Sequence, residues 1–135
     1  MTELQDFRVL VTGASRGIGL AIARELAASG CKVAGLATAR GNLDVAEETV
    51  QGAGGEFLRL EGDVGDPETA GHAVEAIIET WGGLDGLVAN AGITRDNLLL
   101  RMKPADFEYV LRVNLGGAFH LAKACIRPMM KQRSG

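Results

Sequence analysis

The stretch Thr12-Gly13-Ala14-Ser15-Arg16-Gly17-Ile18-Gly19 decides the fold of this chain, because its three glycines stand between an apolar run and an amphipathic segment. Residues 7–12 (FRVLVT) are the aliphatic and β-branched kind that predicts a buried strand. A helix is expected from near Gly17 to Gly30, since apolar residues recur between them at helical spacing. The chain therefore begins with a strand, a glycine-rich turn and a helix.

The same alternation of strand and helix continues along the chain. Further strands are predicted for residues 32–37, 57–60 and 84–89. Helices are predicted for residues 42–52, for residues 67–81 with Asp66 as the N-cap, and from Pro104 onward after a loop over residues 90–103. In the long last helix, Pro128 is expected to introduce a kink or end the helix early.

Four strand-to-helix alternations with short links predict an α/β fold with a parallel sheet, because each crossover returns the chain in the same direction. Right-handed crossovers then place helices on both faces of a doubly wound sheet. The strand order 3-2-1-4 is expected, with four helices. Arg59 in the middle of the third strand indicates that this strand lies at an edge, where a polar side chain can reach water. At 135 residues the chain is one domain.

The composition narrows the class of protein. Hydrophobic residues make up 47% and charged residues 23%, which is typical of a globular protein. The net charge of −3 without a basic run argues against a nucleic-acid partner. No apolar stretch is long enough for a membrane helix, so a soluble cytoplasmic protein is expected.

Cys31 and Cys125 are interpreted as reduced packing thiols. No metal site is predicted, because His72 and His120 lack partners at ligand spacing.

The glycine-rich turn also suggests a binding site. Backbone N–H groups at a helix N-terminus can hold a pyrophosphate if no side chain blocks the approach, and the helix dipole adds about 0.3–1 kcal/mol for an anion. The spacing Gly-x3-Gly-x-Gly differs from the common Gly-x-Gly-x-x-Gly fingerprint of dinucleotide sites. Taken alone, these glycines are equally consistent with an ordinary strand-to-helix turn.

The stretch TGASRGIG resembles the cofactor loop of the short-chain dehydrogenase/reductase family, and further motifs follow in that family's order. Asp63-Val64 follows the third strand, where the family contacts adenine, and Asn90-Ala91-Gly92 follows the fourth strand, where its NNAG motif supports sheet and cofactor. The first asparagine of that motif is replaced by Ala89. Asn114 matches an asparagine that helps hold the family's active-site water chain, which makes it a candidate catalytic residue. The resemblance implies an incomplete Rossmann-type fold.

Together these motifs define the candidate cofactor-binding residues. They are Gly13, Ala14, Ser15, Arg16, Gly17, Ile18, Gly19, Thr38, Asp63, Val64, Asn90, Ala91 and Gly92. Asp63 could instead be only a turn residue. Residues 92–103 resemble the bacterial 3-oxoacyl-[acyl-carrier-protein] reductases in particular. That resemblance implies NADPH-dependent reduction of a 3-ketone on an acyl-carrier-protein-linked substrate in fatty-acid synthesis.

Charge at the end of the second strand favours NADP as the cofactor. An NAD enzyme of this layout places an acid there for the ribose 2′-hydroxyl, and that acid would repel a 2′-phosphate. The sequence has no acid between Val33 and Leu43, whereas Thr38 ends the strand and Arg16 lies in the glycine loop. Arg40 is another candidate cation, although a solvated loop position explains it equally well.

Asn114 stands among apolar residues in the stripe of the long helix, and it is therefore expected to be buried. Because an unpaired buried amide costs about 1–3 kcal/mol, the side chain of Asn114 should bond to neighbouring backbone, serve the family's water chain, or do both.

The only tyrosine, Tyr109, is expected to be a packing or surface residue. The family's catalytic tyrosine has a lysine four residues later, whereas Val113 stands there in this chain.

The family's serine and Tyr-x-x-x-Lys come after the position of Asn114, and Gly135 falls where its fifth strand would begin. Residues 1–135 are therefore expected to be the dinucleotide-binding half of one Rossmann domain, able to bind nucleotide but not to turn over substrate. An exposed edge of the fourth strand or helix face should make it a homo-oligomer or lead it to pair with a missing half. The alternative is a non-catalytic nucleotide-binding or assembly module.

Overall fold

The computed structural model describes residues 4–135 as an α/β fold around one parallel sheet. Its strands are β1 (Arg8–Thr12), β2 (Lys32–Ala37), β3 (Phe57–Glu61) and β4 (Gly86–Val88). They lie in the order β3-β2-β1-β4, and every pairing is parallel. The predicted strand order is confirmed, and β3 lies at an edge as Arg59 indicated.

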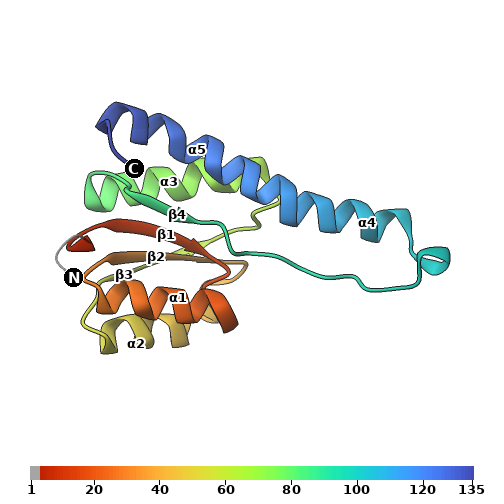
Figure 1. Cartoon of the computed structure of the whole chain (residues 1–135), viewed down its shortest axis with the longest axis horizontal. Coiled ribbons are helices and arrows are strands. Elements are labelled where there is room, and N and C mark those ends of the chain that lie inside the picture. The colour runs from red at the N-terminus through yellow and green to blue at the C-terminus, as the bar shows by residue number, and fades with distance from the viewer. Residues whose placement is uncertain (1–3) are drawn as a thin grey trace.

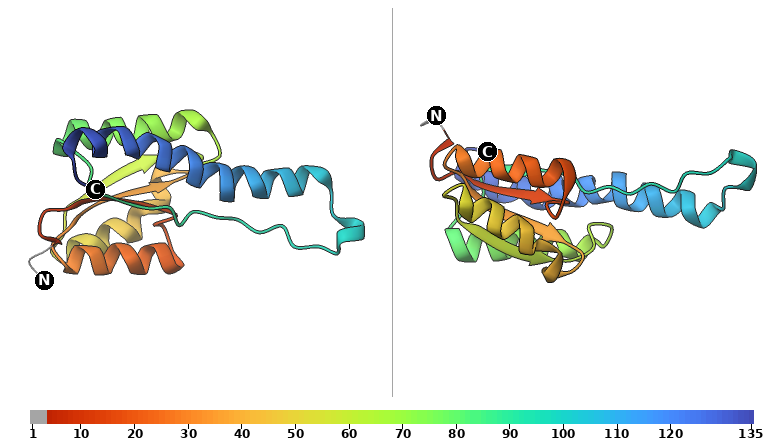
Figure 2. Two further views of the ribbon diagram at one scale, coloured as in Figure 1. Left: turned by 45° about the horizontal axis from the view of Figure 1, so that its top comes forward. Right: turned by 90° about the horizontal axis from the view of Figure 1, so that it is seen from below.

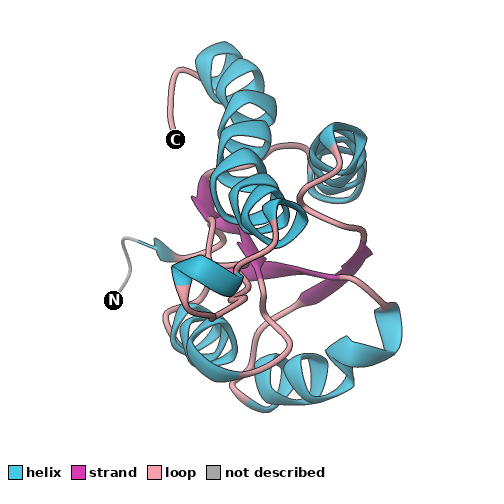
Figure 3. Cartoon of the chain, turned by 90° about the vertical axis from the view of Figure 1, so that its right-hand side faces the viewer, coloured by secondary structure: helices cyan, strands magenta, loops and turns pink. Residues whose placement is uncertain are grey.

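Helices cover both faces of the sheet (Figures 1 and 3). One face carries α1 (Gly17–Ala28) and α2 (Asp44–Gly52), which follows a 3-10 turn at Arg40–Leu43. The other face carries α3 (Pro67–Trp81) and α5 (Gly117–Gln132). A π-helical turn, Arg112–Gly116, joins α5 to the preceding α4 (Pro104–Leu111). Within residues 4–135, no helix has the length and apolar character needed to cross a membrane.

The side chains of β1 divide between two hydrophobic clusters because successive residues of a strand point to opposite faces. Val9 and Val11 pack in the cluster that includes residues of α1 and α2. Leu10 packs in the other cluster, with residues of α3 and α5. Cys31 and Cys125 belong to this interior as free, buried thiols, and burial raises the pKa of Cys125 to about 11. Both cysteines are packing residues, as predicted.

The loop after β4 and α4 form an arm that extends beyond the sheet (Figures 1 and 2). A short 3-10 turn, Leu99–Arg101, lies at its tip. Phe107 and Leu111 are large apolar residues of the long helix, but the structure leaves them 56% and 44% exposed. They are exposed because α4 projects past the sheet on which such residues would pack. Burial begins where the helix reaches the sheet, at Val113 and Gly117.

Pro128 was expected to introduce a kink or to end the last helix early, and the second of these is wrong, because α5 continues to Gln132. The kink stays a prediction. Proline removes the hydrogen bond that an N–H at this position would donate to Ala124 O, but the helix continues past it. The final turn is held by the side-chain amide of Gln132, which donates to Leu84 O at 2.8 Å and accepts from Leu84 N at 2.9 Å. The same contact explains why β4 does not begin at Leu84 as predicted, since the backbone of Leu84 bonds to a side chain instead of a strand.

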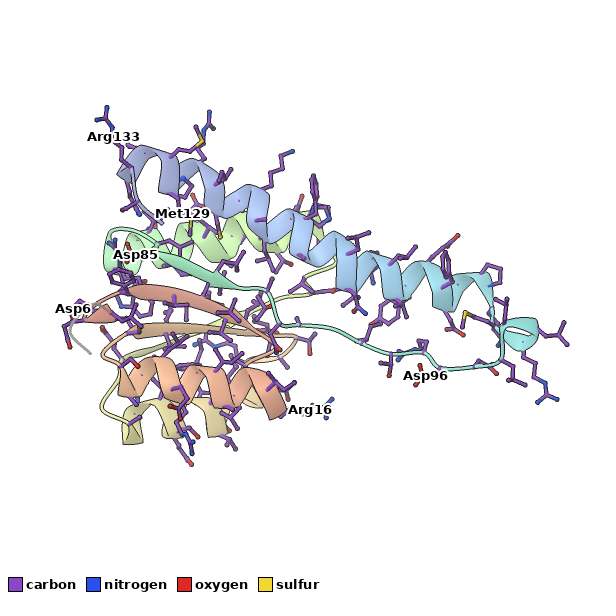
Figure 4. All side chains as sticks on the ribbon, in the orientation of Figure 1. Asp6, Arg16, Asp85, Asp96, Met129 and Arg133 are labelled. Atoms are coloured by element: carbon purple, nitrogen blue, oxygen red, sulfur yellow. The ribbon has the colours of Figure 1, made fainter. Side chains whose placement is uncertain are left out.

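An ion pair joins β1 to the segment before β4 at the end of the sheet opposite Arg16 (Figure 4). Arg8 Nε donates to Asp85 Oδ2 at 2.7 Å, and Arg8 Nη2 donates to Asp85 Oδ1 at 3.0 Å. The backbone N–H of Arg8 also donates to Asp85 Oδ2 at 2.9 Å. These hydrogen bonds hold the pKa of Asp85 below its ordinary value of 3.8.

Replacing Asp85 by asparagine should lower the free energy of unfolding at pH 7 by about 1–3 kcal/mol, because the mostly buried Arg8 loses its charged partner. A depressed pKa in the folded state contributes stability above pH 3.8, and that contribution is lost as the pH falls through the folded-state pKa. Urea denaturation over a pH series should therefore show the difference from wild type shrinking in acid. Asp96→Asn, in the exposed loop, is the control and should change little. A difference that stays constant with pH would contradict this account.

Candidate functional site

A cavity of about 500 Å³ lies at the carboxyl ends of the strands. The strand order reverses between β1 and β4, which is the point in open α/β sheets where ligands bind. Most of the candidate residues named from the sequence line this cavity. They are Gly13, Ser15, Arg16, Gly17, Ile18, Thr38, Asp63, Val64, Asn90, Ala91 and Gly92. Ala14 and Gly19 are buried and are not part of the lining.

The backbone requires glycine at Gly13, in the turn after β1, and at Gly19, in the first turn of α1, because it passes so close to other atoms there. Gly13 has a φ of +65°, and a Cβ there would lie 2.9 Å from Asn90 Nδ2. A Cβ on Gly19 would collide with the carbonyl oxygen of Gly13. In the described chain, Arg16 stands at the N-cap of α1 without a capping hydrogen bond from its side chain. The backbone at the start of α1 is therefore open to an anion.

A set of hydrogen bonds between Thr12 and Asn90 connects the ends of β1 and β4. Thr12 is fully buried, and its Oγ1 accepts from the backbone N–H groups of Asn90 at 3.1 Å and Ala91 at 3.0 Å. Asn90 Nδ2 donates in return to the carbonyl oxygens of Thr12 at 3.2 Å and Gly13 at 3.3 Å. This Thr12–Asn90 clasp fixes the glycine turn against the loop that follows β4.

Polar groups line the cavity beyond the end of β2. Thr38 and Asn42 belong to the lining together with Arg16. Arg40 is exposed and lies outside the lining, where its carbonyl oxygen accepts from Arg59 Nη1 at 3.1 Å. The position of Arg40 thus agrees with the solvated loop cation that the sequence left open.

Asp63 lines the cavity and also shapes the turn after β3. Its Oδ1 accepts from Gly65 N at 2.9 Å, and its Oδ2 accepts from Arg112 Nη1 at 3.1 Å. The two interpretations of Asp63, as a turn residue and as a residue of the site, are therefore geometrically compatible. Val64 follows it and is buried beside Gly117.

Asn114 is exposed, so the expectation that it is buried is wrong. It lies in the π-helical turn, which displaces it from the buried face of the helix. Its Oδ1 accepts from Ile93 N at 2.8 Å, and its Nδ2 donates to Ile93 O at 2.9 Å. The side-chain amide of Asn114 is thus satisfied by backbone groups, which belong to the loop after β4 and not to its own helix.

Tyr109 packs half-buried against the core, as predicted, and also lines the cavity.

Residues 8–135 match the family described as short chain dehydrogenase. This chain belongs to the short-chain dehydrogenase family. The 3-oxoacyl-[acyl-carrier-protein] reductase FabG of Escherichia coli K12 is 48% identical over 126 residues, which cover 93% of this chain and 50% of the reductase. The chain spans about half the length of the curated relatives it matches.

Solved structures of the family share the fold closely. An NAD⁺-bound xylitol dehydrogenase superposes with a TM-score of 0.94 at 35% identity, covering 98% of this chain and 52% of that one. A metagenomic short-chain oxidoreductase in complex with NADP superposes with a TM-score of 0.92 at 32% identity, covering 98% of this chain and 61% of that one. The short-chain dehydrogenase fold thus accompanies both nicotinamide dinucleotides in these neighbours.

Sequence reasoning missed several residues that line the cavity. They are Leu36, Ala37, Asn42, Gly62, Ile93, Tyr109 and Val113. Leu36, Ala37 and Gly62 adjoin residues already singled out, so their place at the ends of β2 and β3 could have revealed them. Tyr109 and Val113 reach the cavity only because the long helix returns across the sheet, and no local pattern gives that position.

Replacing Thr12 by valine should lower the free energy of unfolding by about 1–3 kcal/mol, because the change removes the acceptor for the Ala91 N–H without changing the shape of the buried side chain. Chemical denaturation measures the effect. Thr80→Val is the matched control, since the exposed Thr80 hydroxyl donates only to Ala76 O of its own helix. The control should change stability by less than about 0.5 kcal/mol. Equal losses of unfolding free energy in the two variants would show that the Thr12–Asn90 clasp stabilises the fold no more than an exposed hydroxyl does.

Proposed function

We propose that this chain is the NADP-binding half of a 3-oxoacyl-[acyl-carrier-protein] reductase, an enzyme that reduces a carrier-linked 3-ketone to a 3-hydroxyl. The observation that carries the proposal is the cavity formed by the glycine turn, the end of β2 and the loops after β3 and β4. The 48% identity to a relative named as such a reductase supports the substrate class.

The residues present fit a dinucleotide. The cavity volume of about 500 Å³ is within the usual range for small-ligand sites. The absence of side-chain atoms at Gly13 and Gly19 lets the turn lie close to the start of α1, where backbone N–H groups favour a pyrophosphate. Asp63 and Val64 would lie at the adenine end, and Asn90, Ala91 and Gly92 would support the opposite wall.

The charge at the end of β2 supports NADP over NAD. Thr38 and Asn42 offer hydrogen-bond donors, and Arg16 adds a cation to the lining of the cavity. An acidic residue, which would hold a ribose 2′-hydroxyl and repel a 2′-phosphate, does not occur between Val33 and Leu43. Family membership alone does not decide between NADP and NAD, since one solved neighbour is bound to NAD⁺ and another is in complex with NADP.

The contribution of this chain to the chemistry is binding and orientation. A bound nicotinamide cofactor supplies the hydride. Asn114 fixes the backbone of Ile93 and so holds the loop that walls the cavity. Tyr109, the only tyrosine, has no lysine four residues later, so it does not form the family's proton-donating pair. Residues 1–135 by themselves should therefore bind nucleotide without reducing a ketone.

Replacing Thr38 by aspartate should reverse the nucleotide preference, because a carboxylate at the end of β2 repels a 2′-phosphate and accepts from a 2′-hydroxyl. Isothermal titration should show wild type binding NADP more tightly than NAD, and the variant losing NADP affinity by about tenfold or more. Arg16→Ala should weaken NADP more than NAD.

Arg24→Ala is the control for these titrations, since Arg24 is exposed on α1 and paired with Glu25. The wild-type protein used in these titrations should show no ketone-dependent oxidation of NADPH when the absorbance of NADPH is followed. If folded protein binds neither nucleotide, the proposal is wrong, and ketone reduction by these residues alone would refute the assignment to binding only.

A second candidate function is assembly, and one observation favours it. Large apolar side chains are exposed along the helix from α4 to α5. They are Phe107, Leu111, Leu115, Phe119, Ile126 and Met130. We propose that this apolar helix stripe packs against a second copy of the chain, because water contact of so much apolar surface is unfavourable.

Replacing Leu115, which is 67% exposed, by glutamate should shift the protein from dimer or larger to monomer, because a charge would be buried in the interface. Size-exclusion chromatography with light scattering measures the mass. Val45→Glu is the matched control, since Val45 is 55% exposed on α2, away from the stripe. A monomeric wild-type protein at all concentrations would rule out the assembly role.

A further inference from the structure

Asp63, which lines the cavity, meets a residue far from it in the sequence, Arg112. Arg112 Nη1 donates to Asp63 Oδ2 at 3.1 Å across a separation of 49 residues. The other carboxylate oxygen, Oδ1, accepts from Gly65 N at 2.9 Å. Both oxygens of Asp63 are thereby engaged, and the plane of the carboxylate is fixed relative to the cavity.

The guanidinium of Arg112 is itself held in place by its neighbours. It lies over the ring of Tyr109, 5.1 Å from the ring centroid. It also packs over Gly65, where an added Cβ would lie 2.5 Å from Arg112 Nη1. Arg95, from the loop after β4, lies at 5.1 Å from the same ring. Arg112 therefore connects the π-helical turn to the loop after β3 through contacts that restrict its head group.

A fixed carboxylate can distinguish purines. The 6-amino group of adenine is a donor that a carboxylate oxygen accepts, whereas the 6-oxo group of hypoxanthine is an acceptor that the carboxylate repels. A carboxylate free to rotate would lose conformational freedom on making this bond, and an oriented one avoids that loss. A carboxylate oriented toward the purine 6-position thus favours adenine over a 6-oxo purine.

We infer that Arg112 is a positioning residue for purine recognition, which orients the Asp63 carboxylate toward the 6-amino group of the bound nucleotide. The inference rests on the proposed function, that the cavity binds NADP. The side chains of Arg112 and Asp63 are 46% and 45% exposed, so solvent weakens the ion pair and the effect is modest. Loss of Arg112 should weaken NADP binding by about three- to fivefold.

The test compares NADP with nicotinamide hypoxanthine dinucleotide phosphate, in which a 6-oxo group replaces the purine 6-amino group and N1 carries a hydrogen. In isothermal titration, Arg112→Ala should weaken NADP by about three- to fivefold and the hypoxanthine analogue by less than about twofold, so that the preference for adenine narrows. Arg112→Lys should retain part of the preference, because a lysine keeps the charge but not the planar head group. Arg127→Ala removes the same charge from an exposed position on α5 and should leave both affinities unchanged.

The outcomes separate this inference from the proposed function. If wild type binds neither nucleotide, the proposed function fails and the inference fails with it. If wild type binds NADP but Arg112→Ala weakens both nucleotides equally, the role of Arg112 is structural and only the inference is overturned. The inference is also overturned if Arg112→Ala matches Arg127→Ala for both ligands. Thermal unfolding of each variant identifies any that do not fold, and Arg112→Lys then carries the comparison.

Discussion

The close approach of the glycine turn to the loop after β4 is the contact on which the rest of the site depends. The amide of Asn90 lies against Gly13 and Gly19 and donates to the carbonyl oxygens of Thr12 and Gly13. Because this approach leaves no room for a side chain, it sets where α1 begins and where the backbone N–H groups of its first turn lie. The cavity, the exposed start of α1 and the wall formed by residues 90–93 all follow from it.

The contacts at the two ends of the sheet stabilise different parts of the structure. At the amino end, Arg8 and Asp85 join β1 to the segment before β4 through two side-chain bonds, and Gln132 brings the end of α5 to Leu84. These contacts are structural. At the carboxyl end, Thr12 Oγ1 and Asn114 Oδ1 accept from backbone N–H groups of the loop after β4, and Asn90 Nδ2 donates to Thr12 O. These hydrogen bonds hold the loop after β4, which lines the cavity. Contacts at one end of the sheet thus anchor its strands, and contacts at the other end anchor the loops around the cavity.

Local patterns were enough to predict the strands, because strand formation depends on short-range rules. The strand order and most of the cavity lining were predicted from the resemblance to the short-chain dehydrogenase/reductase family. Arg59 marked the edge strand since a charged side chain in a strand needs water or partners, and it finds Asp44 and Glu47. The expectations that the structure overturned concern features that depend on tertiary contacts. Pro128 stays within α5 because Gln132 is anchored from another part of the chain, and Asn114 is exposed because the helix turn around it is not α-helical.

The π-helical turn at Arg112–Gly116 makes the spacing of residues in this part of the helix intolerant of change. Three consecutive residues meet different parts of the site there: Arg112 reaches Asp63, Val113 lines the cavity, and Asn114 holds Ile93. Gain of one residue would rotate everything beyond it by about 100°. Leu121 and Cys125 would then leave the core, so the length of this segment is constrained by the interior of the protein as strictly as by its cavity.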